Sequence, residues 1–154
     1  MKQFITATKA GIGAMIGIGL LAFSQSVFTG WDLLIAPFGA SAVLLFGVPE
    51  SPLARPLNVI GGHVVTATIG LIFANYVGVC PWSLALATGL AVTTMMVTST
   101  IHPPAGANPI LVMLSRPDWG FVIDPVLIGA VCLVLVAKTY GKLNFVLPTI
   151  LKKQ

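Results

Sequence analysis

Charged side chains are scarce in this sequence. Of its 154 residues, 8% are Asp, Glu, Lys or Arg, whereas 56% are hydrophobic and the mean hydropathy is +0.99. A soluble domain carries about 25% charged residues, because its water-facing surface requires them. The shortage therefore excludes an ordinary soluble enzyme and predicts a protein that lies in the lipid bilayer.

Cysteines and carboxylates are also few. Cys80 and Cys132 have no companion at CxxC spacing, which argues against a disulfide framework and a metal site. The sequence holds four acidic residues and shows no pair of catalytic carboxylates, no nucleophile with a neighbouring base and no phosphate-binding loop. We therefore expect no enzymatic activity, no cofactor and no bound metal.

The net charge of +4 comes mainly from lysines near the two chain ends. These are Lys2, Lys9, Lys138, Lys142, Lys152 and Lys153. Cytoplasmic loops and termini of membrane proteins are enriched in Lys and Arg. This distribution predicts a multi-pass membrane protein with both termini in the cytoplasm, and it gives no reason to expect a nucleic-acid partner.

Four apolar runs are long enough to cross about 30 Å of hydrocarbon as helices. They cover residues 10–29, 59–79, 83–100 and 121–137. Two shorter runs, 33–48 and 105–115, are rich in Gly and Pro near their starts, and a helix of that length spans only about two-thirds of the bilayer core. The predicted fold is an all-α integral membrane protein with a single domain over residues 1–154.

An internal repeat relates the two halves of the chain. A shift of 67 residues lays PFGASAVLLF, which begins at Pro37, on PAGANPILVM, which begins at Pro104. The same shift lays residues 59–70 on 126–137 and Gly62 on Gly129. Each half, about 8–73 and about 75–140, then consists of a long helix, a short segment broken by Gly and Pro, and a second long helix.

Two topologies fit this repeat. If the short segments complete a crossing, each half crosses three times and the halves are inverted; if the segments are re-entrant, each half crosses twice and the halves are parallel. Both topologies keep the termini in the cytoplasm, but Arg55 lies inside in the inverted one and outside in the parallel one. Because basic residues prefer the inside, we favour inverted repeats.

Short segments interrupted by Gly and Pro at corresponding positions of two halves are typical of a transporter's substrate site. Irregular backbone at membrane depth is tolerated where it is buried in protein or lines a cavity. A helix that begins there directs free N–H groups and a positive dipole end into the gap. Two such helix starts facing each other near the midplane would bind a small anion. The alternative is that these small residues only permit close helix packing.

The two short segments offer polar and flexible residues at equivalent positions. Ser41 and Asn108 have side chains suited to helix capping or ligand contact. Gly39 and Gly106 would let the backbone approach a ligand closely. These four residues anchor the predicted substrate site.

Two histidines extend this site. His102 precedes two prolines that enforce extended backbone, so its imidazole would bind an anion, carry a proton or cap the preceding helix. His63 has Ala130 as its repeat counterpart, and a satisfied interior histidine is the alternative there. The full set of predicted substrate-binding residues is Pro37, Phe38, Gly39, Ala40, Ser41, His63, His102, Pro103, Pro104, Ala105, Gly106, Ala107 and Asn108.

Two motifs carry a resemblance to a known family. TSTIHPPAGANP at residues 98–109 and APFGASAVLLFGVPESPLARPLNVIGGH at residues 36–63 resemble the HPP family of integral membrane proteins. That family is described as having four transmembrane helices, and its relatives in plant plastid envelopes and cyanobacteria are associated with nitrite transport. The resemblance implies a bacterial inner-membrane transporter or channel for nitrite or a similar small monovalent anion.

A second class of function stays open at this point. A non-transporting membrane scaffold or sensor subunit would use the same segments only to pack helices, and its interior would be solid where the two segments meet. In either case four to six helices in 16.0 kDa leave little protein to enclose a pathway. We therefore expect a homo-oligomer.

Overall fold

The computed structural model describes residues 1–27 and 32–151, and the side chains of residues 1–24, 26 and 32–143. These parts of the chain form helices and connections and contain no β-strand. Three helices are long and apolar enough to cross a membrane: α1 (Lys2–Val27), α3 (Pro56–Ile72) with its π-helical extension Phe73–Val77, and the helix that ends in α6 (Ile128–Leu151). The expected all-helical membrane fold is confirmed.

The remaining long apolar run forms a shorter helix than we predicted. Residues 83–100 contribute to α4, Pro81–Val97, which has 17 residues. The helix ends there because Ser99 adopts a positive φ of 56° and the chain turns. At 1.5 Å per residue, α4 reaches about 26 Å and is at the lower limit for a membrane span.

The last long helix also differs from its prediction at both ends. The predicted run 121–137 begins as two turns, η5 (Trp119–Val122) and η6 (Ile123–Leu127), and α6 continues far beyond residue 137. Asp124 has non-helical φ and ψ of −124° and 113°. Pro125 explains the kink, because a proline disfavours helical backbone at the residue before it.

The two short segments are alike in length and position. The first consists of α2 (Ala36–Ala42) and a π-helical turn η1 (Val43–Gly47). The second consists of a 3₁₀ turn η4 (Pro103–Ala107) and α5 (Asn108–Ser115). A proline in the first turn starts each segment, where its fixed φ suits a helix and its missing N–H costs nothing.

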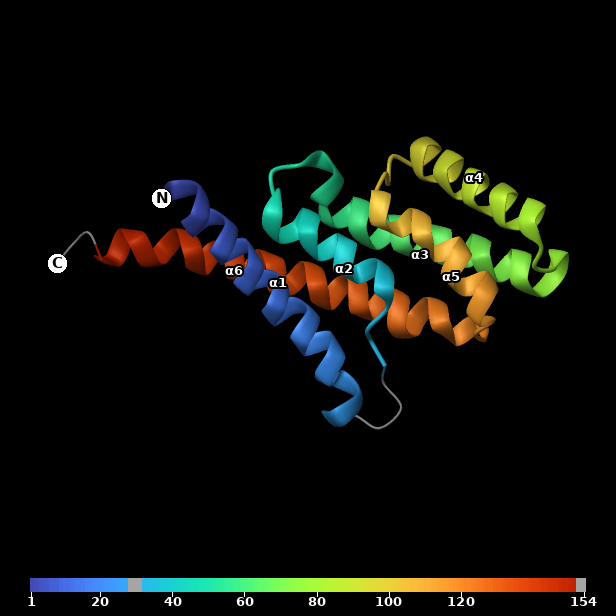
Figure 1. Ribbon diagram of the computed structural model, residues 1–154, viewed down its shortest axis with the longest axis horizontal. Coiled ribbons are helices and arrows are strands. Elements are labelled where there is room, and N and C mark those ends of the chain that lie inside the picture. Colours follow the sequence, from blue (N-terminus) through green and yellow to red (C-terminus); the bar gives the residue numbers. More distant parts are fainter. Residues whose placement is uncertain (28–31, 152–154) are drawn as a thin grey trace.

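The long helices pair across the two halves of the sequence (Figure 1). α1 packs against and crosses α6, while α4 packs against α3. The first long helix of each half therefore lies against the last helix of the other half. The two short segments lie between these pairs, where α3 also contacts α6 and α5.

Two glycines mark corresponding close contacts in this arrangement. A Cβ added to Gly62 in α3 would lie 2.9 Å from the carbonyl oxygen of Thr100, and one added to Gly129 in α6 would lie 2.8 Å from that of Leu33. Both distances are too short for a carbon atom, so each position requires glycine. Gly129 follows Gly62, and Thr100 follows Leu33, by the same 67 residues as in the sequence repeat.

Several basic residues lie near the start of α1 and the middle of α6. Arg55, Lys138 and Lys142 line one pocket of about 290 Å³. The hydroxyl of Tyr140 donates to the backbone carbonyl of Lys9 at 2.8 Å, so the start of α1 lies there too. Lys152 and Lys153 lie outside the described residues. The connection that contains Arg55 is thus on the same side as the basic parts of α1 and α6.

Candidate functional site

Four buried polar side chains meet between α2, α3 and the second short segment. Ser41 comes from α2, His63 from α3, and Asn108 from the first position of α5, while His102 immediately precedes η4. Each is 0% exposed. All four are residues that the sequence predicted for the substrate site, and the structure brings them into one hydrogen-bonded chain.

One arrangement of protons, with both histidines neutral, accounts for the hydrogen bonds of this chain. The carbonyl oxygen of Leu53 can only accept, so Nδ1 of His102, 2.8 Å away, carries a proton. Nε2 of the neutral His102 then accepts from the hydroxyl of Ser41 at 2.8 Å. The same hydroxyl oxygen accepts from Nε2–H of His63 at 2.8 Å, and Nδ1 of His63 accepts from the amide of Asn108 at 3.0 Å. Both histidines are neutral in this arrangement.

The amide of Asn108 closes the chain at its other end. Its Nδ2 lies 3.0 Å from the carbonyl oxygen of His63 and 3.0 Å from the hydroxyl oxygen of Thr66. Thr66 donates its own proton to the carbonyl of Gly62 at 2.8 Å. The two hydrogens of the Asn108 amide are therefore shared among three acceptors, which are these two oxygens and Nδ1 of His63. Oδ1 of Asn108 is buried without a hydrogen-bond partner, which is unusual because buried polar atoms are nearly always paired.

Aromatic and apolar groups keep water away from this chain. The ring of Phe38 packs edge-on against the ring of His63, with 5.0 Å between the ring centroids. The ring centroids of His63 and His102 are 5.1 Å apart. The surrounding elements α2, α3, α4, η4 and α5 contain no Asp, Glu, Lys or Arg. Hydrogen bonds gain strength in such surroundings, whereas an unpaired charge would be costly.

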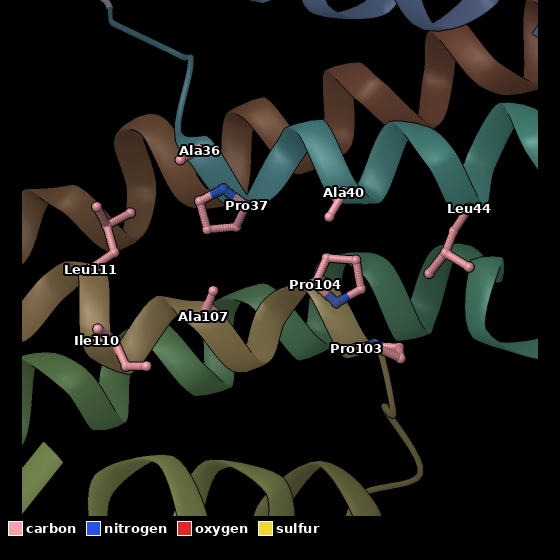
Figure 2. A pocket seen from close by; sticks show the side chains of 9 residues that line it. All are labelled: Ala36, Pro37, Ala40, Leu44, Pro103, Pro104, Ala107, Ile110 and Leu111. Carbon is pink, nitrogen blue, oxygen red and sulfur yellow. The ribbon is translucent and has the colours of Figure 1, made fainter. Parts of the chain in front are cut away.

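The outer faces of the two short segments line an apolar pocket of about 730 Å³. Figure 2 shows the segments side by side and antiparallel, with Pro37 and Ala40 on one and Pro104 and Ala107 on the other. Four residues of the first segment line the pocket together with the residues 67 positions later. These pairs are Ala36 and Pro103, Pro37 and Pro104, Ala40 and Ala107, and Leu44 and Leu111.

The two helix starts do not face each other, and this part of the prediction was wrong. Because the segments are antiparallel neighbours, their starts pass one another (Figure 2). Amides of both first turns are also already used. The N–H of Phe38 donates to the carbonyl of Ile35 at 3.0 Å, and that of Ala105 donates to the carbonyl of His102 at 2.9 Å.

Two predicted glycines, Gly39 and Gly106, lie away from the hydrogen-bonded chain. A Cβ added to Gly39 or Gly106 would meet no atom within 4 Å. Each glycine therefore borders open space, and the opposite face of its segment contacts the hydrogen-bonded chain. Ala105, in contrast, is fully buried against Gly62 of α3.

Sequence reasoning missed two partners of this chain. Thr66 lies three residues after His63 and therefore on the same face of α3, so that spacing would have indicated it. The carbonyl of Leu53 belongs to the turn η2, Pro52–Ala54, and nothing in the sequence indicates its contact with His102. Among the described residues no three His, Cys, Asp or Glu side chains are grouped to hold a metal ion.

The sequence matches the family described as "HPP, transmembrane region" over residues 2–146. This chain belongs to the HPP transmembrane family. His102, Pro103 and Pro104 spell the three letters of the family name, and the histidine of that stretch is a member of the buried chain.

The HPP chain is also similar to two transmembrane proteins of Dictyostelium discoideum. One is 34% identical over 140 residues, covering 83% of this chain and 48% of the relative; the other is 38% identical over 136 residues, covering 82% and 43%. The chain thus spans less than half the length of either relative. No solved structure matches it.

Proposed function

We propose that this HPP protein transports a small monovalent anion, nitrite first among those to test, across a bacterial inner membrane. The observation that carries the proposal is the buried chain of Ser41, His63, His102 and Asn108 inside a helical membrane protein. Polar and ionisable side chains are costly at membrane depth and commonly mark the path of a substrate or ion. Hydroxyl, imidazole and amide donors suit a small oxyanion.

A group of basic side chains supports an anionic substrate. Arg55, Lys138 and Lys142 line a pocket that Ala54 also lines. Ala54 follows Leu53, whose carbonyl oxygen ends the hydrogen-bonded chain. Clustered positive charge raises the local concentration of anions and speeds their encounter with a site. The pocket is therefore placed to collect anions beside the entrance to the chain.

The described conformation is closed around the chain, since its four side chains are fully buried. Transport requires the short segments to move, and their outer faces border an open apolar groove. We also propose that protomers assemble into a homo-oligomer because 16.0 kDa encloses little volume.

We propose that the two halves of the chain are inverted repeats. The antiparallel short segments and the corresponding contacts of Gly62 and Gly129 support a two-fold relation between the halves. Arg55 lies beside Lys138 and Lys142, as expected when the connection before α3 is cytoplasmic. Both termini are then cytoplasmic as well.

Cysteine labelling tests this topology. In a background without Cys80 and Cys132, we expect Glu50→Cys to react with a membrane-impermeant maleimide from the cytoplasmic side and Asp118→Cys from the opposite side. Both parent residues are exposed. Parallel repeats with re-entrant segments would put both cysteines on the non-cytoplasmic side, so labelling of both from one side would overturn the inverted arrangement.

Nitrite flux tests the function itself. Purified protein in proteoliposomes is expected to carry nitrite down an imposed gradient faster than empty liposomes of the same lipid. Gly89→Ala in α4 serves as a control that should keep the wild-type rate, because its added methyl group meets no atom within 4 Å. A wild-type rate equal to that of empty liposomes would refute transport of nitrite, and chloride, nitrate and formate in the same assay would define the substrate range.

A further inference from the structure

Ser41 has two acceptors within reach of a single proton. Its hydroxyl oxygen lies 2.8 Å from Nε2 of His102 and 3.3 Å from the carbonyl oxygen of Pro37, one turn earlier in α2. The neutral chain uses the shorter contact. The longer one is available whenever His102 no longer accepts.

A second arrangement of protons fits the same heavy atoms. If Nε2 of His102 gains a proton, the hydroxyl of Ser41 turns to donate to Pro37. Its oxygen, which has two lone pairs, then accepts from Nε2–H of both His102 and His63. The carbonyl of Leu53 continues to accept from Nδ1–H of His102. The chain can therefore take up one proton through the rotation of one hydroxyl group.

We propose that His102 binds a proton that crosses the membrane together with the anion, so that transport is electroneutral proton–anion cotransport. This inference rests on the proposed function and names the co-substrate of the same site. The proton comes from water on the side to which the site is open, forms an N–H bond at Nε2 of His102, and leaves to water on the other side. No other bond forms or breaks.

The charges around His102 explain why proton and anion would bind together. His63 is the titratable group in contact with it, the helices packed around it carry no charged residue, and Glu50 and Arg55 near η2 are exposed. An imidazolium in such surroundings is costly unless an anion pairs with it. Binding is reciprocal, so the proton raises the affinity for the anion by the same factor as the anion raises that for the proton.

The wild-type protein provides the decisive measurement. We expect the initial rate of nitrite uptake, after subtraction of the leak of nitrous acid into empty liposomes, to be unchanged by a membrane potential set with valinomycin and potassium. A pH difference of about one unit, acid outside, should raise that rate severalfold and at most about tenfold. A pH-sensitive dye should report proton entry in step with nitrite.

The possible outcomes separate this inference from the proposed function. Uptake that follows the membrane potential and ignores the pH difference would overturn cotransport while leaving anion transport intact. No uptake above empty liposomes would refute the proposed function itself. Both results come from the wild-type protein, so neither depends on the folding of a variant.

His102→Gln then tests the assignment to this residue. The amide can keep hydrogen bonds to Ser41 and Leu53 but cannot hold the proton. We expect the acceleration by a pH difference to be lost, and any remaining flux to respond to membrane potential. Gly89→Ala in α4, whose added methyl group meets no atom within 4 Å, should keep the wild-type response to both gradients. A His102→Gln protein with wild-type, pH-driven and electroneutral uptake would overturn the role of His102.

Discussion

Ser41→Ala is expected to reduce anion transport by about tenfold to a hundredfold, the effect of losing one or two hydrogen bonds of about 1.4 kcal/mol each. The serine hydroxyl is the single group that joins the two histidines, at 2.8 Å from each. Without it, Nε2–H of His63 and Nε2 of His102 remain buried without partners. The measurement is the initial rate of nitrite uptake in proteoliposomes.

Ser115→Ala is the matched control for this substitution. Ser115 is an exposed serine at the end of α5 whose hydroxyl donates to the carbonyl of Leu111 at 2.8 Å. The Ser115→Ala substitution also removes a serine hydroxyl from a short helix, and it should leave uptake unchanged. Equal rates for Ser41→Ala and wild-type protein would show that the buried chain takes no part in transport.

Gly62→Ala is expected to destabilise the fold by about 1–3 kcal/mol, which is the usual cost of adding a methyl group to a packed interior. The new Cβ would lie 2.9 Å from the carbonyl oxygen of Thr100 and 3.0 Å from Cβ of His102. A backbone carbonyl cannot rotate away, so the start of the second short segment must shift. We expect a lower midpoint of thermal unfolding in detergent and loss of uptake.

Gly89→Ala provides the comparison for that experiment. Gly89 lies inside α4, and a Cβ there would meet no atom within 4 Å. Alanine favours a helix over glycine by up to about 1 kcal/mol, so this variant should unfold at the same or a higher temperature. A Gly62→Ala protein as stable as Gly89→Ala would contradict the packing described for α3.

The location of the polar chain could be predicted because prolines and polar residues are rare inside apolar segments. His102 before two prolines, and Ser41 and Asn108 at equivalent positions of the two short segments, stand out against an apolar background. His63 follows two glycines in a helix that must pack closely. These residues lie together because their polar groups need hydrogen-bond partners, and the apolar helices around them offer few others.

The faces of the short helices could not be predicted from the sequence. In a soluble helix the alternation of polar and apolar residues indicates the buried side, but in a membrane both sides of α2 are apolar. The sequence alone therefore does not reveal that Phe38 and Ser41 are buried while Gly39 is exposed. The antiparallel packing of the short segments likewise depends on contacts between distant parts of the chain.

The pairing of α1 with α6 has a consequence for the synthesis of this protein. These two helices are distant in the sequence but pack against each other (Figure 1), so their contact cannot form until the helices between them have been synthesised. Gly13 and Gly17 of α1 lie beside Phe46 of the first short segment as well as Leu133 and Tyr140 of α6. The first short segment can therefore cover part of this surface early, and packing of the bundle is completed by a late contact between segments far apart in the sequence.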